Sequence, residues 1–208
     1  MGSGQVENDV IIIADEIYNR LVYNGQEPVT FAETSEKIKE QTIILNGVSK
    51  TYAMTGWRIG FAVGNKEVMN ALSKYASQAS GNPTGISQHA AIAAYKDEHD
   101  EVIKMRQSFE DRLNKAYELM QTVPGFELAK KPQGAFYLFP DASEAAEMTG
   151  YDSVDDFCLA LIEKAHVVSV VGSSFGLPDH LRFSYAVEEE VFEEGIRRIK
   201  EFIETNRK

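Results

Sequence analysis

The chain has 208 residues, and its 32 acidic and 21 basic side chains give a formal net charge of −11. This balance disfavours nucleic acid and anionic membranes as partners, because both repel negative charge. Its one cysteine, Cys158, excludes an internal disulfide framework and lies in an apolar helical pattern typical of a core thiol. No apolar run approaches membrane-spanning length, and we expect no signal peptide and a cytoplasmic protein.

Short apolar runs predict strands in the first part of the chain. They span residues 10–14, 42–45 and 58–63, and β-branched runs of this kind are typical of strands covered on both faces. Periodicity predicts a helix over residues 66–79, and after the helix-breaking sequence G-N-P-T-G an Ala-rich run predicts a second, closely packed helix over residues 86–95. The alternation predicts an α/β fold with a mainly parallel sheet.

The second part of the chain changes character. A long charged helix is predicted over residues 97–122, and its narrow apolar stripe suits a helix that bridges two domains. Short strands and amphipathic helices then predict a small α+β domain. The strands are expected at 126–128, 135–139, 167–171 and 181–185, and the helices at 153–164 and 188–204. We expect an expression scar and entry segment at 1–7, a large-domain part at 8–96, and an interdomain helix with the small domain at 97–208.

A lysine follows the second predicted strand in the stretch S-K-T-Y-A-M-T-G-W-R-I-G, residues 49–60. At the end of a buried strand a charged Lys50 is costly, so its surroundings should lower its pKa and make it a nucleophile for carbonyl compounds. The alternative is that the aliphatic part of the Lys50 side chain packs against the protein while its amine reaches water. Arg58 carries a fork of donors that suits a phosphate, or it forms a surface ion pair. Ser49 supplies a further donor.

Asp15 ends the first predicted strand, where open α/β sheets bind ligands. An anionic Asp15 there holds a heterocyclic nitrogen protonated; the alternative is a turn or helix cap. Tyr18 lies three residues after Asp15, and we expect its side chain at the same end of the sheet. The alternative is that Tyr18 packs in the core. With Lys50 and Arg58, these groups suit a cofactor with an aldehyde, a phosphate, a basic ring nitrogen and a phenolic oxygen. Pyridoxal phosphate has all four.

Several segments resemble one family of enzymes. The sequence G-V-S-K-T-Y-A-M-T-G-W-R-I-G, residues 47–60, resembles the pyridoxal-phosphate attachment signature of class I and II aminotransferases, closest to the aspartate and aromatic types of bacteria. Further similar segments are A-D-E-I-Y-N-R-L-V-Y, G-N-P-T-G-I-S-Q-H-A-A-I-A-A-Y, Q-G-A-F-Y-L-F-P, V-G-S-S-F-G and L-R-F-S-Y-A. The resemblance covers residues 8–204. It implies part of a fold-type-I large domain followed by the small C-terminal domain.

The resemblance also implies roles for the cofactor side of the site. Lys50 would hold pyridoxal phosphate as a Schiff base and move a proton between substrate and cofactor carbons. Asp15 would keep the ring nitrogen protonated, and Tyr18 would donate a hydrogen bond to the ring hydroxyl oxygen. Arg58 would bind the phosphate, with Ser49 as a weaker neighbour.

On the substrate side, the resemblance implies that Arg182 takes the α-carboxylate of the amino acid as a bidentate pair. Tyr52, Trp57 and Phe136 are expected to pack near the site. The implied reaction moves an amino group between an L-amino acid and a 2-oxo acid, and the implied assembly is a homodimer. β-Elimination and decarboxylation remain alternatives, although Arg182 favours substrates that keep the α-carboxylate.

Members of the family that this sequence resembles are longer than this chain. Their N-terminal half supplies a phosphate-binding loop, a ring-stacking aromatic residue and the entry arm, and we expect this chain to be the C-terminal half. A sheet without its flanking strands exposes edges and apolar surface. The alternative function is therefore a catalytically inactive folded fragment that associates with itself.

Overall fold

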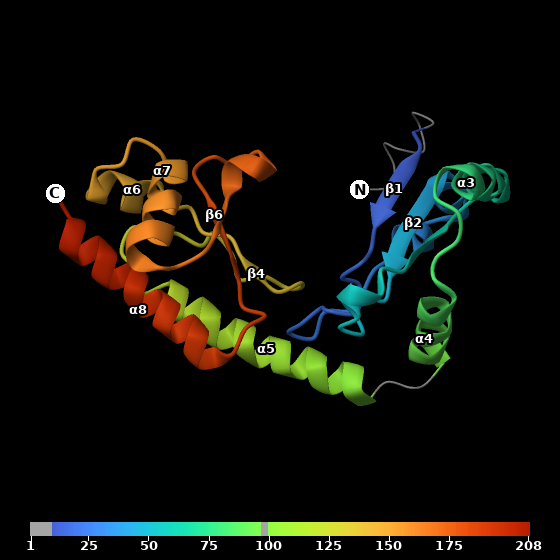
Figure 1. Cartoon of the computed structure of the whole chain (residues 1–208), viewed down its shortest axis with the longest axis horizontal. Coiled ribbons are helices and arrows are strands. Elements are labelled where there is room, and N and C mark those ends of the chain that lie inside the picture. Colours follow the sequence, from blue (N-terminus) through green and yellow to red (C-terminus); the bar gives the residue numbers. More distant parts are fainter. Residues whose placement is uncertain (1–9, 97–99) are drawn as a thin grey trace. The chain divides into compact units, whose positions relative to one another are not determined.

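The computed structural model describes residues 10–96 and 100–208 (Figure 1). The chain divides into two compact units, Met1–Arg106 and Gln107–Lys208, and the boundary falls within helix α5 (Asp100–Met120). Within the described ranges, no helix combines the length and the apolar character needed to cross a membrane.

The first unit contains a three-stranded sheet in the order β1-β2-β3. Its strands are β1 (Ile12–Asp15), β2 (Thr42–Gly47) and β3 (Gly60–Val63). β1 runs parallel to β2 and β3 runs antiparallel to it, with Gly47 opposite Gly60. The α/β class is thus confirmed, whereas the predicted third strand begins two residues later than expected and leaves Arg58 outside the sheet.

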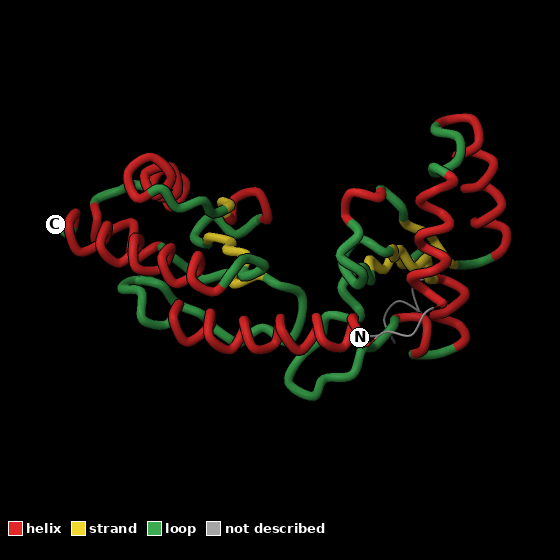
Figure 2. Tube along the Cα trace, turned by 60° about the horizontal axis from the view of Figure 1, so that its bottom comes forward, coloured by secondary structure: helices red, strands yellow, loops and turns green. Residues whose placement is uncertain are grey.

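The expectation that the first strand is buried on both faces is wrong. Ile11 and Ile13 are 68% and 66% exposed. β2 is the only strand that pairs with β1 in the described part of the chain, and α3 (Lys66–Ala79) and α4 (Gly85–Lys96) lie together to one side of the sheet (Figures 1 and 2). The side chains of Ile11 and Ile13 therefore stay uncovered.

Helices α3 and α4 confirm the two helices predicted here, but α4 is not closely packed, since Ile86 is 73% exposed. Asn65 caps α3, because its side-chain oxygen accepts a hydrogen bond from the amide of Glu67 at 2.9 Å. Leu72 and Tyr75 on α3 are nonetheless exposed. A short helix that the sequence reading missed, α2 (Glu36–Gln41), begins after Ser35, whose hydroxyl accepts from the Ile38 amide at 3.2 Å.

The second unit has an antiparallel sheet in the order β4-β6-β5. Its elements after α5 are β4 (Tyr137–Leu138), α6 (Ser143–Thr149), α7 (Val154–Ala160), the π-helix η3 (Leu161–Ala165), β5 (Val170–Val171), the 3₁₀ helix η4 (Gly172–Phe175), β6 (Leu181–Ser184) and α8 (Glu189–Asn206). The α+β character is as predicted, but residues 126–128 form only one bridge, between Glu127 and Asp141. The carbonyl of Gly125 instead accepts from the Ala145 amide of α6.

The core of the second unit lies between its sheet and its helices. Its largest fully buried side chains are Tyr185, Phe157, Leu113, Met120, Leu138, Leu161, Leu181, Ile199 and Ile203. Cys158 is 2% exposed, and its Sγ lies 3.2 Å from the hydroxyl oxygen of Ser169. Burial raises the pKa of this thiol, although the Ser169 hydrogen bond opposes the shift. The predicted core thiol is confirmed.

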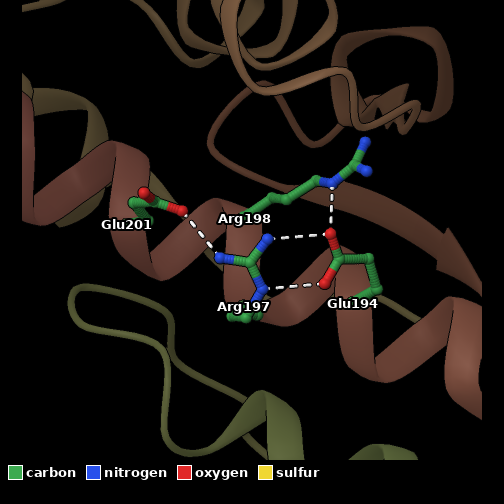
Figure 3. Close-up of polar contacts among 4 residues, drawn as sticks. All are labelled: Glu194, Arg197, Arg198 and Glu201. Atoms are coloured by element: carbon green, nitrogen blue, oxygen red, sulfur yellow. Dashed lines mark hydrogen bonds and ion pairs between the residues drawn. The ribbon is translucent and has the colours of Figure 1, made fainter.

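The outer face of α8 carries a ladder of ion pairs (Figure 3). Arg197 binds Glu194 with two nitrogens, Nε and Nη2, at 2.7 and 2.8 Å, and reaches Glu201 with Nη1 at 2.8 Å. Nε of Arg198 donates to the same Glu194 carboxylate at 2.8 Å. These hydrogen bonds, Arg197 first, lower the pKa of Glu194 from 4.5 to about 2.

Two glycine-to-alanine changes should have opposite effects on the second unit. Gly125 has a φ of +73°, and a Cβ there would lie 2.5 Å from the Ala145 nitrogen, so Gly125→Ala should cost more than about 1 kcal/mol of unfolding free energy. Gly195 lies inside α8 with nothing within 4 Å of an added Cβ, so Gly195→Ala should stabilise by about 0.5–1 kcal/mol. Hydrogen exchange of the buried Ile199 amide measures both. Equal effects would contradict this account.

The Glu194 ladder predicts a dependence of α8 stability on acid. Because the folded-state pKa is depressed, the contribution is complete above pH 4.5 and is lost as the pH falls towards about 2. Titration of the Glu194 carboxyl carbon by NMR should give a midpoint of about 2, which moves up in an Arg197→Ala, Arg198→Ala double variant. Lys200→Ala, which removes a charge from the same helix, should leave the midpoint in place. An unchanged midpoint in the double variant would refute the ladder.

Candidate functional site

Strand direction brings three charged candidates to one edge of the first unit's sheet. Because β1 and β2 are parallel, Asp15 at the end of β1 and Lys50, three residues after β2, lie at the same edge. Because β3 is antiparallel, its beginning also lies there, and Arg58 precedes it by two residues. Residues distant in sequence thus converge where ligands bind open sheets.

Lys50 lies in a tight turn between buried neighbours. Val48 and Thr51 are 1% and 3% exposed, and the Ala53 amide donates to the Lys50 carbonyl at 3.4 Å. Lys50 itself is half-buried, and its Nζ lies 5.9 Å from the centroid of the Tyr18 ring. The backbone of the lysine is therefore held while its amine faces an aromatic ring. Ser49, also half-buried, precedes Lys50 in this turn.

Arg58 is held by an unusual backbone. Its φ and ψ are 51° and 52°, the left-handed region, and it follows the 3₁₀ helix η2 (Thr55–Trp57). Its Nη1 donates to the Thr55 carbonyl at 2.8 Å, and the side chain is exposed. Ala53, with a φ of 52°, is a second left-handed residue in the same stretch. Such conformations cost energy in residues other than glycine, and they gather at ligand sites.

Asp15 forms the turn cap that was one of its two interpretations, and its role towards a ring nitrogen remains a prediction. Its Oδ1 accepts from the Ile17 amide at 3.2 Å, as a turn cap does. Asp15 is exposed, and within residues 10–96 and 100–208 it makes no other hydrogen bond or ion pair. Its second oxygen remains open to a ligand. The neighbouring Glu16 is engaged in structure, because its Oε1 accepts from the Thr30 hydroxyl at 2.6 Å and the Phe31 amide at 3.1 Å.

An apolar hollow of about 410 Å³ lies beside this edge, between the β2–β3 pair and α4. Tyr95 of α4 lines it and meets Tyr52 edge-on at 5.2 Å and Phe61 at 5.7 Å between ring centroids. Burial raises the pKa of both tyrosines, although the positive charge of Arg20 opposes the shift. Neither Tyr95, near the end of α4, nor Phe61, in β3, was predicted here, because a single aromatic residue carries no signal of its own. Trp57, which was expected to pack near the site, is 43% exposed.

Arg182 lies in the second unit, on the central strand β6. Its guanidinium carbon is 4.5 Å from the centroid of the Tyr137 ring and 4.4 Å from that of Phe175. Phe136, which was expected near the site, stacks on Phe109 at 5.6 Å and packs against Tyr137 at 4.7 Å. The rings around Arg182 were not predicted, because they come from other parts of the chain.

A family model described as "Aminotransferase class I and II" matches residues 4–199. The chain belongs to this family. An aspartate aminotransferase of Bacillus sp. (strain YM-2) is 50% identical over 198 residues, which are 95% of this chain and 50% of that protein. An aspartate aminotransferase of Bacillus subtilis (strain 168) is 47% identical, over 98% of this chain and 52% of that protein.

A solved aspartate aminotransferase from Rhizobium meliloti has the same fold as this member of the aminotransferase family. The TM-score is 0.90 at 35% identity, over 96% of this chain and 51% of that one. The chain spans about half the length of the relatives it matches. The predicted aminotransferase resemblance is confirmed, whereas the individual roles of the site residues remain predictions. Those residues are Asp15, Tyr18, Ser49, Lys50, Arg58 and Arg182.

In this aminotransferase chain, the sheet edge at which the three charged candidates lie depends on the close approach of Gly47 and Gly60. A Cβ at Gly47 would lie 2.9 Å from the Ile59 carbonyl oxygen and 3.0 Å from the Cα of Gly60. Gly47→Ala should therefore cost about 1 kcal/mol or more of unfolding free energy in the first unit, since backbone must shift to make room. Gly56→Ala is the control, because an added Cβ there meets nothing within 4 Å.

The fluorescence of Trp57, the single tryptophan, reports denaturant unfolding of this unit in both variants. The Gly47→Ala midpoint should fall below that of Gly56→Ala. Coincident midpoints would show that the close approach of β2 and β3 contributes nothing.

Proposed function

We propose that the chain holds pyridoxal phosphate at the shared sheet edge of the first unit. The observation that carries the proposal is the convergence of Asp15, Lys50 and Arg58 there, with the Tyr18 ring 5.9 Å from the amine of Lys50. An amine, an unpaired carboxylate oxygen and an exposed guanidinium match the aldehyde, ring nitrogen and phosphate of that cofactor. The donor set thus fits the group. When bound, pyridoxal phosphate supplies an electron sink for carbanion chemistry at the substrate carbon.

Each side chain has a distinct task in this proposal. The amine of Lys50 anchors the cofactor and afterwards holds and moves a proton at its Nζ. The carboxylate of Asp15 favours the protonated ring nitrogen, because an adjacent negative charge stabilises a positive one. The guanidinium of Arg58 binds the phosphate, with the Ser49 hydroxyl beside it. The phenol of Tyr18 donates a hydrogen bond to the ring oxygen.

We further propose that the reaction is the transfer of an amino group between an L-amino acid and a 2-oxo acid. The names of the relatives, aspartate aminotransferases from several bacteria, support this reaction and make aspartate the first donor to test. Arg182 would bind the α-carboxylate that both substrates share. Because the chain spans about half of each relative, we expect the complete activity only when the other half is supplied, either in trans or in a longer protein.

A second candidate function rests on the uncovered apolar surface of the first unit. Ile11, Ile13, Tyr75 and Ile86 are between 66% and 73% exposed. Apolar residues and an unpaired strand edge of this kind favour association with another chain. In this candidate the chain folds and associates without binding the cofactor at Lys50.

An absorbance titration with pyridoxal phosphate separates the two candidates. The wild-type chain should give a saturable visible band of lysine-bound cofactor that changes on addition of aspartate. Lys50→Ala should lose the band, because its amine is gone. Lys74→Ala, which removes an exposed lysine from the same unit, should keep it. A band of equal size in all three proteins, or none in any, would reject cofactor binding at Lys50 and leave the associating chain.

A further inference from the structure

Two aromatic rings flank the guanidinium of Arg182. Its central carbon lies 4.5 Å from the Tyr137 ring centroid and 4.4 Å from the Phe175 ring centroid. At these distances each ring attracts the cation. Aromatic rings accept no conventional hydrogen bonds from the guanidinium in its plane, so its N–H donors stay available to an anion.

The strand register places the first ring. Tyr137 of β4 lies opposite Ser184 of β6, and Arg182 is two residues before Ser184 on the same strand. Residues two apart in a strand share a face, so Tyr137 and Arg182 are diagonal neighbours on one side of the sheet. A long side chain reaches its diagonal neighbour, so the contact follows from the fold.

A closed loop places the second ring. Phe175 is the last residue of η4, and η4 directly follows β5. The loop that contains both, Gly172 to His180, returns the chain to β6. The Gly172 amide donates to the His180 carbonyl at 2.8 Å, and the Leu177 amide donates to the Gly172 carbonyl at 3.0 Å. A Cβ on Gly172 would lie 2.1 Å from the Leu177 oxygen, so the loop closes over a position that admits only glycine.

A side-chain contact anchors this loop to the helix beside it. The Ser173 hydroxyl donates to the Asp155 carboxylate of α7 at 2.8 Å. With its base closed at Gly172 and its body tied to α7, the loop presents Phe175 from a fixed backbone. Phe175 is 48% exposed, and its ring also meets Phe139 edge-on at 6.0 Å between centroids.

The charge of Arg182 is left unneutralised. Among the described residues no carboxylate pairs with it, and its side chain makes no hydrogen bond, although it is half-buried. Partial burial without a paired carboxylate removes some hydration from this charge and leaves it uncompensated. The fold places two rings against this guanidinium, and its N–H donors have no acceptor among the described residues.

We propose that Tyr137 and Phe175 are positioning residues that hold Arg182 for a planar carboxylate bound in the plane of its fork. This inference rests on the proposed function, in which Arg182 takes the substrate carboxylate. The rings fix a long side chain before the ligand arrives, so less rotamer freedom is lost on binding. They also exclude water from the faces, which strengthens the pair at the edge.

NMR of the Arg182 Nε–H group in the full chain tests the proposal. Without any ligand, its heteronuclear NOE should equal that of the backbone, whereas an arginine moving freely would give a low value. Acetate should then shift this signal saturably, and chloride at equal ionic strength should not. Phe175→Leu and Tyr137→Leu should each lower the NOE and weaken acetate binding about three- to tenfold.

Conservative variants separate positioning from general damage to the domain. Tyr137→Phe and Phe175→Tyr keep a ring and should restore wild-type acetate affinity. Leu177→Ala, an exposed change in the same loop, should leave the NOE and the affinity unchanged. A low NOE in the wild-type chain overturns the proposal whether or not any variant folds.

The outcomes also separate this inference from the function on which it rests. Acetate binding that is equal in the wild type and both leucine variants overturns the role of the rings and leaves Arg182 as the carboxylate site. No acetate shift in the wild type rejects Arg182 as that site and the rings with it. The pyridoxal titration reports on Lys50 in the other unit, so cofactor binding stands or falls by its own experiment.

Discussion

The direction of three short strands determines which residues meet in the first unit. The parallel β1–β2 pair brings two carboxyl ends to one edge, and the antiparallel β3 brings its beginning to the same edge. The return is possible because glycines face each other at Gly47 and Gly60, where the backbones approach too closely for a Cβ. Asp15, Lys50 and Arg58 share an edge for this reason. A third parallel strand would have sent Arg58 to the opposite end of the sheet.

The two units are packed to different degrees, and the proposed cofactor site is on the looser one. Fully buried apolar side chains in the described part of the first unit are few, whereas the second unit has a continuous core. Those of the first unit are Leu21, Tyr23, Ile38 and Val48. A region with few buried contacts opens at low free-energy cost, and a ligand or partner that binds only the closed form stabilises it. Cofactor binding in the first candidate, or a second chain over Ile13 in the other, would each stabilise this unit.

Sequence patterns correctly predicted features that depend on residues close together in the chain. They failed for features that depend on contacts with residues far away in the chain. The helix at Lys66–Ala79 agreed at both ends, because its apolar period and the Asn65 cap are local. Arg58 was assigned to a strand because it begins a run of apolar residues, but the chain must reverse there, and the reversal gives it a left-handed backbone. Exposure of Ile13 depends on what packs against β1, which no local pattern contains. The charged residues at the sheet edge were predicted from the ends of strands. Phe175 belongs to a loop, so its ring left no periodic signal in the sequence.

The two arginines proposed as anion ligands are supported in different ways, and the difference matches their proposed ligands. Arg58 is exposed, with one nitrogen bound to the Thr55 carbonyl and a backbone held in a costly conformation. Its remaining donors can be approached from several directions, as the many oxygens of a phosphate require. Arg182 has two aromatic ring centroids within 4.5 Å of its guanidinium carbon, and in the positioning proposal these rings confine an acceptor to the plane of the fork. A flat carboxylate meets that restriction with two parallel hydrogen bonds, whereas a tetrahedral phosphate would place oxygens against the rings. The proposed division between cofactor phosphate and substrate carboxylate thus follows from how each guanidinium is held.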